Sequence, residues 1–393
     1  MSFIGVVVPV LNAERLQRGE RIYVPARTRV TYLIGAGATQ GSISEYGSNQ
    51  NLLMNNLRDE LQESFGELVN RQFKKSANLK ALVNNASVGR WDFEQLITFI
   101  EESLSRSNAK FVEAARDLFA NALSKRLIAA ETEIGSASWG MYTNLIDMHN
   151  VYDLGEDIVG FLTLNYDDFI ERAAEELGFD IDLGLNGAGV PRKDNSITIL
   201  KLHGSLNWSD YWPVTVRKEE KGLWIPPGIR KRKNDYPFNL IWGKAREILD
   251  CDILRVIGCN VGSNDWDLVS LIFATRHFHY DGRPFAVEFI SDLETVVRVQ
   301  LEMPYLEARH FSEDVAMKTE IVRDVLPGGA GDIRDSEGKF TKDFSREFPR
   351  NATNAFSYWL KFKGRLLRDS NVAISTPSGS FSKFMDRRDE VGV

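Results

Sequence analysis

The chain has 393 residues, of which 43% are hydrophobic and 26% are charged, and it carries a formal net charge of −7. These proportions are those of a globular protein with enough residues for two or three domains. The negative total gives no indication of a general nucleic-acid-binding surface, so we expect no direct binding to nucleic acid. The basic run Arg230–Lys233 fits a solvated loop better than a binding site.

The chain offers no segment suited to membrane insertion or secretion. No apolar stretch approaches the roughly 20 residues that a membrane-spanning helix needs. The apolar run from Phe3 to Leu11 lacks the basic start and small-residue cleavage site of a signal peptide, so we interpret residues 1–28 as an N-terminal arm.

The two cysteines, Cys251 and Cys259, flank one predicted strand. Fully extended, their Cα atoms would lie roughly 26 Å apart, too far for a disulfide. Two cysteines also cannot form a Cys₄ zinc site. The sequence therefore predicts a reduced, cytoplasmic protein without zinc.

A long helical block follows the first predicted strand. Arg29–Ile34 is an apolar run typical of a buried strand. From about residue 50 to 150, apolar side chains recur at helical spacing. The predicted helices in this block run from Asn55 to Val69, from Trp91 to Ile100, from Phe111 to Ala130 and from Trp139 to Asn150.

From residue 156 onward, predicted strands and helices alternate. The strands cover 158–164, 196–202, 253–258 and 284–290, the last of which would close the sheet, and the helices cover 167–177, 238–250 and 264–277. This alternation predicts an α/β fold, a Rossmann-like doubly wound parallel sheet with a helical insertion after the first strand. We assign residues 29–303 to this domain. Residues 304–393 form a C-terminal extension, with a helix at Phe356–Leu367, for which we expect a role in assembly.

The loop Gly35-Ala36-Gly37-Ala38-Thr39 directly follows the first strand. Glycines allow the backbone to approach a bulky anion closely, and free N–H groups at the start of a following helix would hold a pyrophosphate. The loop departs from the dinucleotide fingerprint G-x-G-x-x-G because the third glycine, Gly41, comes one position late. On its own, the loop also fits a simple turn.

Two further strands end in polar residues suited to catalysis, Asn165 in Thr163-Leu164-Asn165-Tyr166-Asp167 and His203 in Lys201-Leu202-His203-Gly204. Because ligands bind at the carboxyl ends of parallel strands, we expect both side chains at one rim. Asn165 could hold a ribose hydroxyl or a water, or it could cap the next helix. His203 can take a proton near neutral pH, or it could be a packed core residue. We interpret Asp167 and Asp168 mainly as acids of the first helical turn, and a secondary role in bracing the loop stays open.

Taken in order, these loops resemble the Sir2 (sirtuin) family. The resemblance covers about 29–48 and 156–295, about half of the chain, and rests on Gly35-Ala36-Gly37-Ala38-Thr39, Thr163-Leu164-Asn165-Tyr166-Asp167, His203-Gly204-Ser205 and Gly258-Cys259-Asn260. It implies that the glycine loop holds the phosphates of NAD, that Asn165 orients the nicotinamide ribose and a water, and that His203 acts as the base. The NAD-binding residues that it implies are Gly35, Ala36, Gly37, Ala38, Thr39, Asp167, Gly204, Ser205, Gly258, Asn260 and Ser291.

The departures from the family indicate which reaction to expect. Sirtuin deacylases carry a Cys₄ zinc module after the catalytic histidine, whereas Trp208–Lys233 contains no cysteine. Thr39 stands in place of the usual serine, and Cys259-Asn260 replaces a Thr/Ser-Ser pair. A helical insertion without a zinc module is similar to the Sir2-like proteins of bacterial anti-phage defence, which hydrolyse NAD.

The resemblance thus implies an NAD glycohydrolase with NAD as substrate, no metal, homo-oligomeric assembly and a partner such as a HerA-like ATPase. Two alternatives stay open. One is an NAD-dependent protein deacylase or ADP-ribosyltransferase, and the other is a non-catalytic subunit of a nuclease or ATPase complex that senses NAD or ADP-ribose.

Overall fold

The computed structural model describes most of the central part of the chain. Its continuous ranges are 27–72, 109–152, 154–185, 195–206, 233–262, 265–277, 285–306, 308–311 and 352–369, with residues 81, 95, 97–98, 101–102, 208, 224–226 and 381 in addition. The predicted arm at residues 1–28 therefore lies almost entirely outside the described residues, as does most of 208–233.

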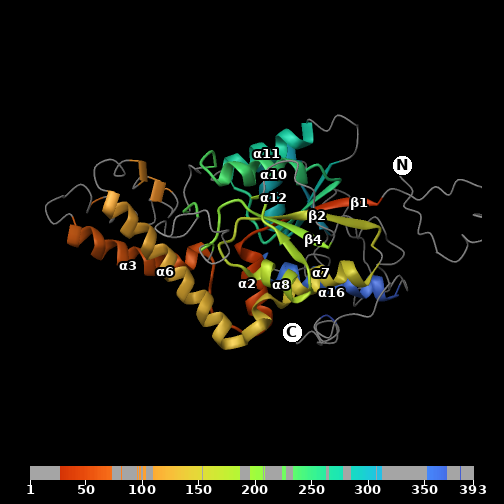
Figure 1. The fold of residues 1–393 in the computed structure, drawn as a ribbon, viewed down its shortest axis with the longest axis horizontal. Coiled ribbons are helices and arrows are strands. Elements are labelled where there is room, and N and C mark those ends of the chain that lie inside the picture. The colour runs from red at the N-terminus through yellow and green to blue at the C-terminus, as the bar shows by residue number, and fades with distance from the viewer. Residues whose placement is uncertain are drawn as a thin grey trace, which may run out of the picture.

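A seven-stranded sheet forms the centre of the molecule, with the strand order β3-β4-β2-β1-β5-β6-β7 (Figure 1). Every neighbouring pair is parallel. The strands are β1 (Thr28–Ile34), β2 (Glu156–Thr163), β3 (Asp180–Asp182), β4 (Ser196–Lys201), β5 (Ile253–Ile257), β6 (Ala286–Ile290) and β7 (Arg309–His310). The strand β1 lies at the centre of the sheet, with β2, β4 and β3 on one side and β5, β6 and β7 on the other. The predicted doubly wound α/β fold is therefore confirmed.

The sheet is wider than the sequence predicted. The strand at 284–290 does not close it, because β7 pairs with β6 through Arg309 and His310. On the opposite edge, β3 pairs with β4 and was not predicted at all. Both additional strands have only two or three residues, too few for a period-two pattern to stand out.

Helices cover both faces of the sheet (Figure 1). One layer contains α2 (Ala36–Glu45), α7 (Gly140–Val151), α8 (Phe169–Glu176) and α16 (Ala352–Asp369), and the other contains α10 (Phe238–Ile248), α11 (Trp266–His277) and α12 (Leu293–Glu302). Alternate residues of β1 belong to the two cores, with Tyr32 and Ile34 in one and Leu33 in the other. Burial on both faces explains why the central strands are continuous apolar runs.

The predicted helical insertion is present between β1 and β2. It contains α3 (Met54–Gln72), α6 (Ala109–Ile134), the short η2 (Gly135–Trp139) and α7. The long helices α3 and α6 pack together and extend beyond the sheet (Figure 1). Of the helix predicted at Trp91–Ile100, only residues 95, 97 and 98 are described, and these are helical.

The C-terminal extension contributes to the core of this domain. The predicted helix at Phe356–Leu367 lies within α16, which packs on α2. Phe356 and Trp359 are buried, and Glu45 at the end of α2 accepts a hydrogen bond from Ser357 Oγ at 2.6 Å. The apolar face of α16 is therefore used within the chain, and the assembly role of residues 304–393 stays a prediction.

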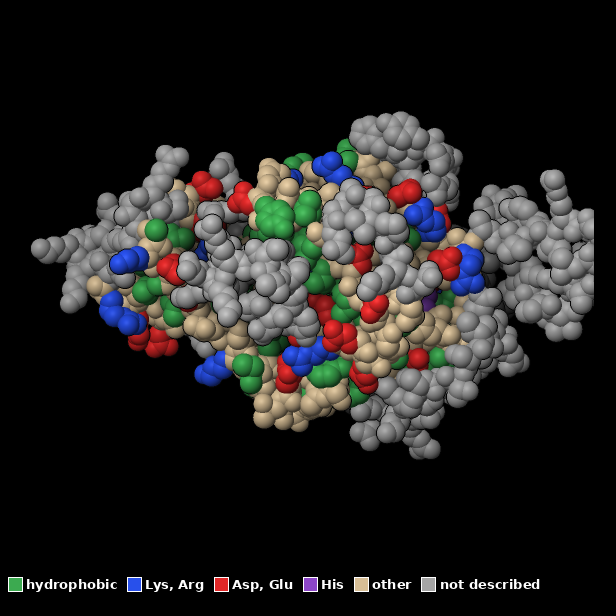
Figure 2. All heavy atoms as spheres, viewed as in Figure 1, with side chains coloured by type: hydrophobic (Ala, Val, Ile, Leu, Met, Phe, Trp, Pro, Cys, Tyr) green, Lys and Arg blue, Asp and Glu red, His purple; other side chains and the backbone are tan. Residues whose placement is uncertain are grey.

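The described surface shows no preference for one sign of charge on the face drawn in Figure 2. Acidic and basic side chains are interspersed there among the residues that are coloured. Within the described ranges, no helix is both long and apolar enough to cross a membrane.

We expect the fold to lose stability as the pH falls from 7 to 5, because two histidines are held neutral. Burial lowers the pKa of His149 to about 4 and that of His310 to about 4. The unfolded chain, with an ordinary histidine pKa of about 6.5, binds these protons earlier. Stability is thus complete above about pH 6.5 and falls below it by up to ~1.4 kcal/mol per pH unit for each histidine.

Urea unfolding at pH 7, 6 and 5 measures this dependence. His149→Gln keeps an acceptor for the Tyr32 hydroxyl, which lies 2.7 Å from His149 Nε2, and should remove the contribution of one histidine from the slope. An unchanged slope in this variant would contradict the assignment to His149.

Candidate active site

Five strands end in register at one edge of the sheet. The hydrogen-bonded row that ends them consists of Lys201, Thr163, Ile34, Ile257 and Ile290. The loops that follow these residues therefore begin beside one another at the carboxyl edge, where α/β proteins bind ligands. The strands thus deliver Asn165 and His203 to the same rim, as the sequence predicted.

The glycine loop packs directly against the loop that follows β5. Gly35 occupies the N-cap position of α2, and the N–H of Gly37 donates to the Gly258 carbonyl at 2.8 Å. A Cβ on Gly35 would lie 2.6 Å from the Gly258 oxygen. Gly258 has φ +59°, and a Cβ there would lie 1.9 Å from the Ala38 nitrogen. These glycines are required by contact between two backbones, a reason that the sequence did not reveal, and binding of phosphate by the loop stays a prediction.

The close contact leads us to expect that Gly258→Ala is strongly destabilising. The new methyl group must displace the start of α2, and the left-handed backbone adds strain, for a combined cost of roughly 2–4 kcal/mol. Gly66→Ala is the matched control, because its Cβ meets no atom within 4 Å and it lies in α3. That control should be stabilised by about 0.5–1 kcal/mol. Urea midpoints measure both, and equal values for the two variants would refute the packing argument.

The side chain of Asn165 is held in one orientation. Its Nδ2 donates to the Gly35 carbonyl at 3.1 Å and to Thr39 Oγ1 at 2.9 Å, so both of its N–H bonds are used. Its Oδ1 is buried and has no hydrogen-bond partner in the described chain. The alternative that Asn165 caps the next helix is wrong, because α8 begins at Phe169 with Asp168 at its N-cap.

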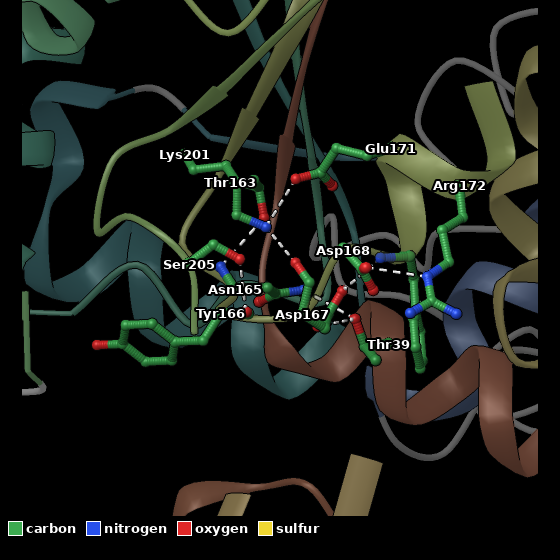
Figure 3. A network of polar contacts seen from close by, with 11 residues as sticks. Thr39, Thr163, Asn165, Tyr166, Asp167, Asp168, Glu171, Arg172, Lys201 and Ser205 are labelled. Atoms are coloured by element: carbon green, nitrogen blue, oxygen red, sulfur yellow. Dashed lines mark hydrogen bonds and ion pairs between the residues drawn. The ribbon is translucent and has the colours of Figure 1, made fainter. Parts of the chain in front are cut away.

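Thr39 connects Asn165 to a buried polar network (Figure 3). Its Oγ1 donates to Asp167 Oδ2 at 3.0 Å and lies 2.7 Å from the Tyr142 hydroxyl. Burial raises the pKa of Tyr142 well above its ordinary value, and the charge of Asp167 acts in the same direction. Tyr142 therefore keeps its proton and donates to Thr39, which accepts from Tyr142 and Asn165 while donating to Asp167. This arrangement fixes the amide of Asn165 with its oxygen as the unused group.

Asp167 and Asp168 differ from their predicted role, since the helix predicted at 167–177 begins two residues later. Asp167 Oδ1 accepts the N–H of Phe169 at 3.2 Å, while its other oxygen accepts from Thr39. Asp168 instead accepts from Arg172 at 2.9 Å. Asp167 thus belongs to the polar network, in addition to satisfying the start of α8.

His203 is buried at the rim beside aromatic and acidic groups. Its Nε2 lies 3.9 Å from Asp265 Oδ1, and its ring centroid lies 6.2 Å from that of Tyr166. Trp224 packs edge-on against Tyr166 and stacks on Phe119 of α6, with centroids 5.6 Å apart in both pairs. The helical insertion therefore reaches the histidine side of the site. An imidazole beside a carboxylate is suited to accept and hold a proton.

The remaining predicted residues fall into two groups. Gly204 takes φ +75°, and Ser205 Oγ donates to the Tyr166 carbonyl at 2.9 Å, so both shape the loop around His203. On the other side of β1, exposed Asn260 accepts from Arg298, and the Ser291 carbonyl is 2.9 Å from His310 Nε2. The structure thus joins Gly35, Thr39, Asp167 and Asn165 directly, whereas Asn260 and Ser291 lie past β5 and β6.

Three polar residues of the site were not singled out from the sequence. Tyr142 lies in the helical insertion, where no pattern distinguishes it from a core residue. Lys201 ends an apolar strand, and Asp265 precedes α11 after a glycine-containing loop. Of these, Lys201 stood in the motif that contains His203, and Asp265 follows the Gly258-Cys259-Asn260 motif by five residues. Among the described residues, no group of three or more His, Cys, Asp or Glu side chains could hold a metal ion.

Comparison with protein families supplies an independent finding about the same strands. The model of the family described as "SIR2-like domain" matches residues 159–284. This part of the chain is therefore similar to a SIR2-like domain. The match begins within β2 and ends before β6, so it includes Asn165 and His203 but not the glycine loop.

Solved structures of Sir2 proteins are also similar to the chain, at low identity. One, from a study of the mechanism and regulation of Sir2 enzymes, has a TM-score of 0.34 and 11% identity, covering 86% of this chain and 93% of the other. Another, a mutant Sir2 homologue in complex with ADP-ribose, has a TM-score of 0.26 and 14% identity, covering 67% and 80%. Neither likeness is close enough to support an inference about a residue or a reaction. A comparison with curated proteins gave no match.

Proposed function

We propose that the chain hydrolyses NAD to nicotinamide and ADP-ribose. The observation that carries this proposal is the buried Oδ1 of Asn165, whose own Nδ2 is fully used by Gly35 and Thr39. Leaving a buried acceptor unpaired costs about 1–3 kcal/mol. A ligand that fills this place must therefore offer a donor, such as a ribose hydroxyl or a water.

The other requirements of a dinucleotide are also met by residues of the chain. The first turn of α2 contains no acidic residue, and Ala36 at its start is exposed. A helix start of this kind favours an anion such as a pyrophosphate. The loops that flank it carry Asn165 on one side and Asn260 on the other, so the two halves of NAD would extend along the rim in opposite directions.

The reaction requires three contributions from the protein. The bond between the nicotinamide nitrogen and C1′ of the ribose breaks, and the oxygen of a water forms a bond to C1′. Asn165 Oδ1 would accept a hydrogen bond from the ribose or that water, and His203 would take the proton that the water loses. The carboxylate of Asp265, 3.9 Å from His203 Nε2, favours the resulting positive charge. General-base assistance of this type contributes about 10²–10⁴ in rate.

The test is product analysis with NAD in ¹⁸O-labelled water, with and without an acetylated peptide. We expect nicotinamide and ADP-ribose in equal amounts, one ¹⁸O in each ADP-ribose, and no dependence on the peptide. Nicotinamide release that requires the peptide would identify a deacylase, and ADP-ribose attached to protein would identify a transferase. Binding of NAD without turnover, even in extract from phage-infected cells, would identify a sensor. Each of these results would overturn the hydrolase proposal.

For the cell, we propose that this activity depletes NAD during anti-phage defence, in a homo-oligomer with a partner such as a HerA-like ATPase. Support comes from the helical insertion between β1 and β2 and from the cysteine-free segment after His203. NAD levels measured after phage infection should fall in cells that carry the wild-type chain and stay constant in cells that carry His203→Ala.

A further inference from the structure

A fully buried lysine lies beneath the proposed site. Lys201 ends β4, and none of its side chain is exposed. Its Nζ donates to the backbone carbonyl of Asp167 and lies 2.9 Å from Glu171 Oε1 (Figure 3). Transfer of a lysine charge from water to such a place is unfavourable unless partners surround it. Its two contacts lie on the segment between β2 and α8 and on the first turn of α8.

Those contacts join two loops that carry site residues. Lys201 pairs with Thr163 in the sheet, and it lies two residues before His203. Its ammonium group crosses to the loop that carries Asn165 and Asp167. The same loop is fastened from the other side by Thr39, through Asn165 Nδ2 and Asp167 Oδ2.

We propose that Lys201 is a positioning residue for NAD hydrolysis, holding the segment 165–168 so that Asn165 keeps its oxygen toward the substrate. This inference rests on the proposed function for its kinetic consequences. Its structural consequence, an ordered loop in the absence of substrate, can be measured without that function.

The charge of Lys201 also sets the state of Asp167. The charged and titratable groups that act on or are acted on by Asp167 are Lys201 from β4, Tyr142 from α7 and the adjacent Asp168. Glu171 from α8 pairs with Lys201. Burial raises the pKa of Asp167, and Lys201 is the strongest opposing influence. An ionised Asp167 accepts a hydrogen bond from the Thr39 hydroxyl, so the oxygen of Thr39 stays available as the acceptor for Asn165. Without Lys201, Asp167 would be protonated at a higher pH and would compete with Asn165 as a donor to Thr39.

The experiment compares full-length Lys201→Met with the wild type in nicotinamide release between pH 5 and 9. We expect kcat to fall about 10- to 100-fold, the scale of a misplaced catalytic group, with a much smaller change in KM. We also expect the acidic limb of the pH profile to move to higher pH, because removing a cation raises the pKa of Asp167. A kcat within twofold of wild type and an unmoved limb would overturn the proposal.

Two further variants separate positioning from folding. Lys201→Met/Glu171→Gln removes both charges of the buried pair, which should recover stability but not kcat. Recovery of kcat in this double variant would show that charge balance alone matters, against the proposal. Glu288→Gln is the matched control, because it weakens another buried ion pair, with Arg255, outside the site. It should lower stability and leave kcat unchanged.

Hydrogen–deuterium exchange supplies the reading that does not depend on NAD turnover. Peptides covering residues 163–169 should exchange faster in Lys201→Met than in wild type and should be unchanged in Glu288→Gln. Unchanged exchange in Lys201→Met refutes the positioning role even if the chain does not hydrolyse NAD. Faster exchange in a chain that never turns over NAD refutes the proposed function while leaving the ordering role of Lys201 supported.

Discussion

His203→Ala and Asn165→Ala are each expected to reduce nicotinamide release from NAD by about 10²–10⁴-fold. In the first variant no group remains to take the proton of the attacking water. In the second, the rim loses the buried acceptor that fixes the ribose or the water. Asn165→Ala also loses the hydrogen bonds to Gly35 and Thr39, so it should cost roughly 1–2 kcal/mol of stability.

Matched controls separate the loss of chemistry from the loss of structure. Asn144→Ala removes another fully buried amide, whose Nδ2 donates to the Tyr46 hydroxyl at 3.0 Å, and His149→Gln removes another histidine. Both should retain wild-type kcat per folded molecule, as determined by circular dichroism and nicotinamide chromatography. The double variant His203→Ala/Asn165→Ala should be no slower than the worse single one, because groups that act together are not additive. Turnover that survives in both single variants would eliminate the assignment.

The positions and the parallel direction of the main strands could be predicted because the physics that buries them acts on the sequence directly. A central parallel strand is apolar on both faces, and Thr28–Ile34 and Ile253–Ile257 show this as short runs between polar segments. The edge strands β3 and β7 could not be predicted in this way. Their pairing depends on β4 and β6 being in place, not on a pattern of their own.

The candidate site, too, contains some residues that could be predicted from the sequence and some contacts that could not. Asn165 and His203 were visible because each follows a strand by only two residues, and register then brings their loops to one edge. The hydrogen bonds that orient Asn165 were not visible, since Thr39 lies 126 residues away in sequence. Tyr142, which donates to Thr39, comes from a helical insertion whose sequence indicates only burial.

The glycines of the loop that follows β1 show that one sequence motif can have two different physical causes. The sequence predicted that Gly35 and Gly37 allow a ligand to approach. In the structure, the space that their side chains would need is filled by Gly258 and Cys259. A turn that packs on another strand's loop needs glycine for the same steric reason as a turn that packs on a phosphate, so the motif alone cannot distinguish the two.

A buried charge cluster on the face of the sheet that α7 and α16 cover holds the central strands and α16 together. Arg255 of β5 donates to Glu156 through both terminal nitrogens, at 2.6 and 2.7 Å, and to Glu288 through Nε at 2.5 Å. Its guanidinium also lies 5.6 Å from the Trp359 ring centre of α16. Burial alone would raise the pKa of Glu156, but the charge and hydrogen bonds of Arg255 outweigh it and hold that pKa well below its usual range.

Arg255→Met is therefore expected to destabilise the fold by roughly 3–5 kcal/mol, since it leaves two carboxylates without their cation in a buried place. Arg255→Met/Glu156→Gln/Glu288→Gln removes all three charges and should recover much of that loss, because an uncharged cluster avoids the desolvation penalty. Urea unfolding at pH 7 measures both variants. The single variant should also lose its deficit as the pH falls through the range where the freed carboxylates take up protons. A single variant as stable as wild type at pH 7, or a triple variant less stable than the single one, would show that packing around Arg255, and not its charge, holds β5 to its neighbours.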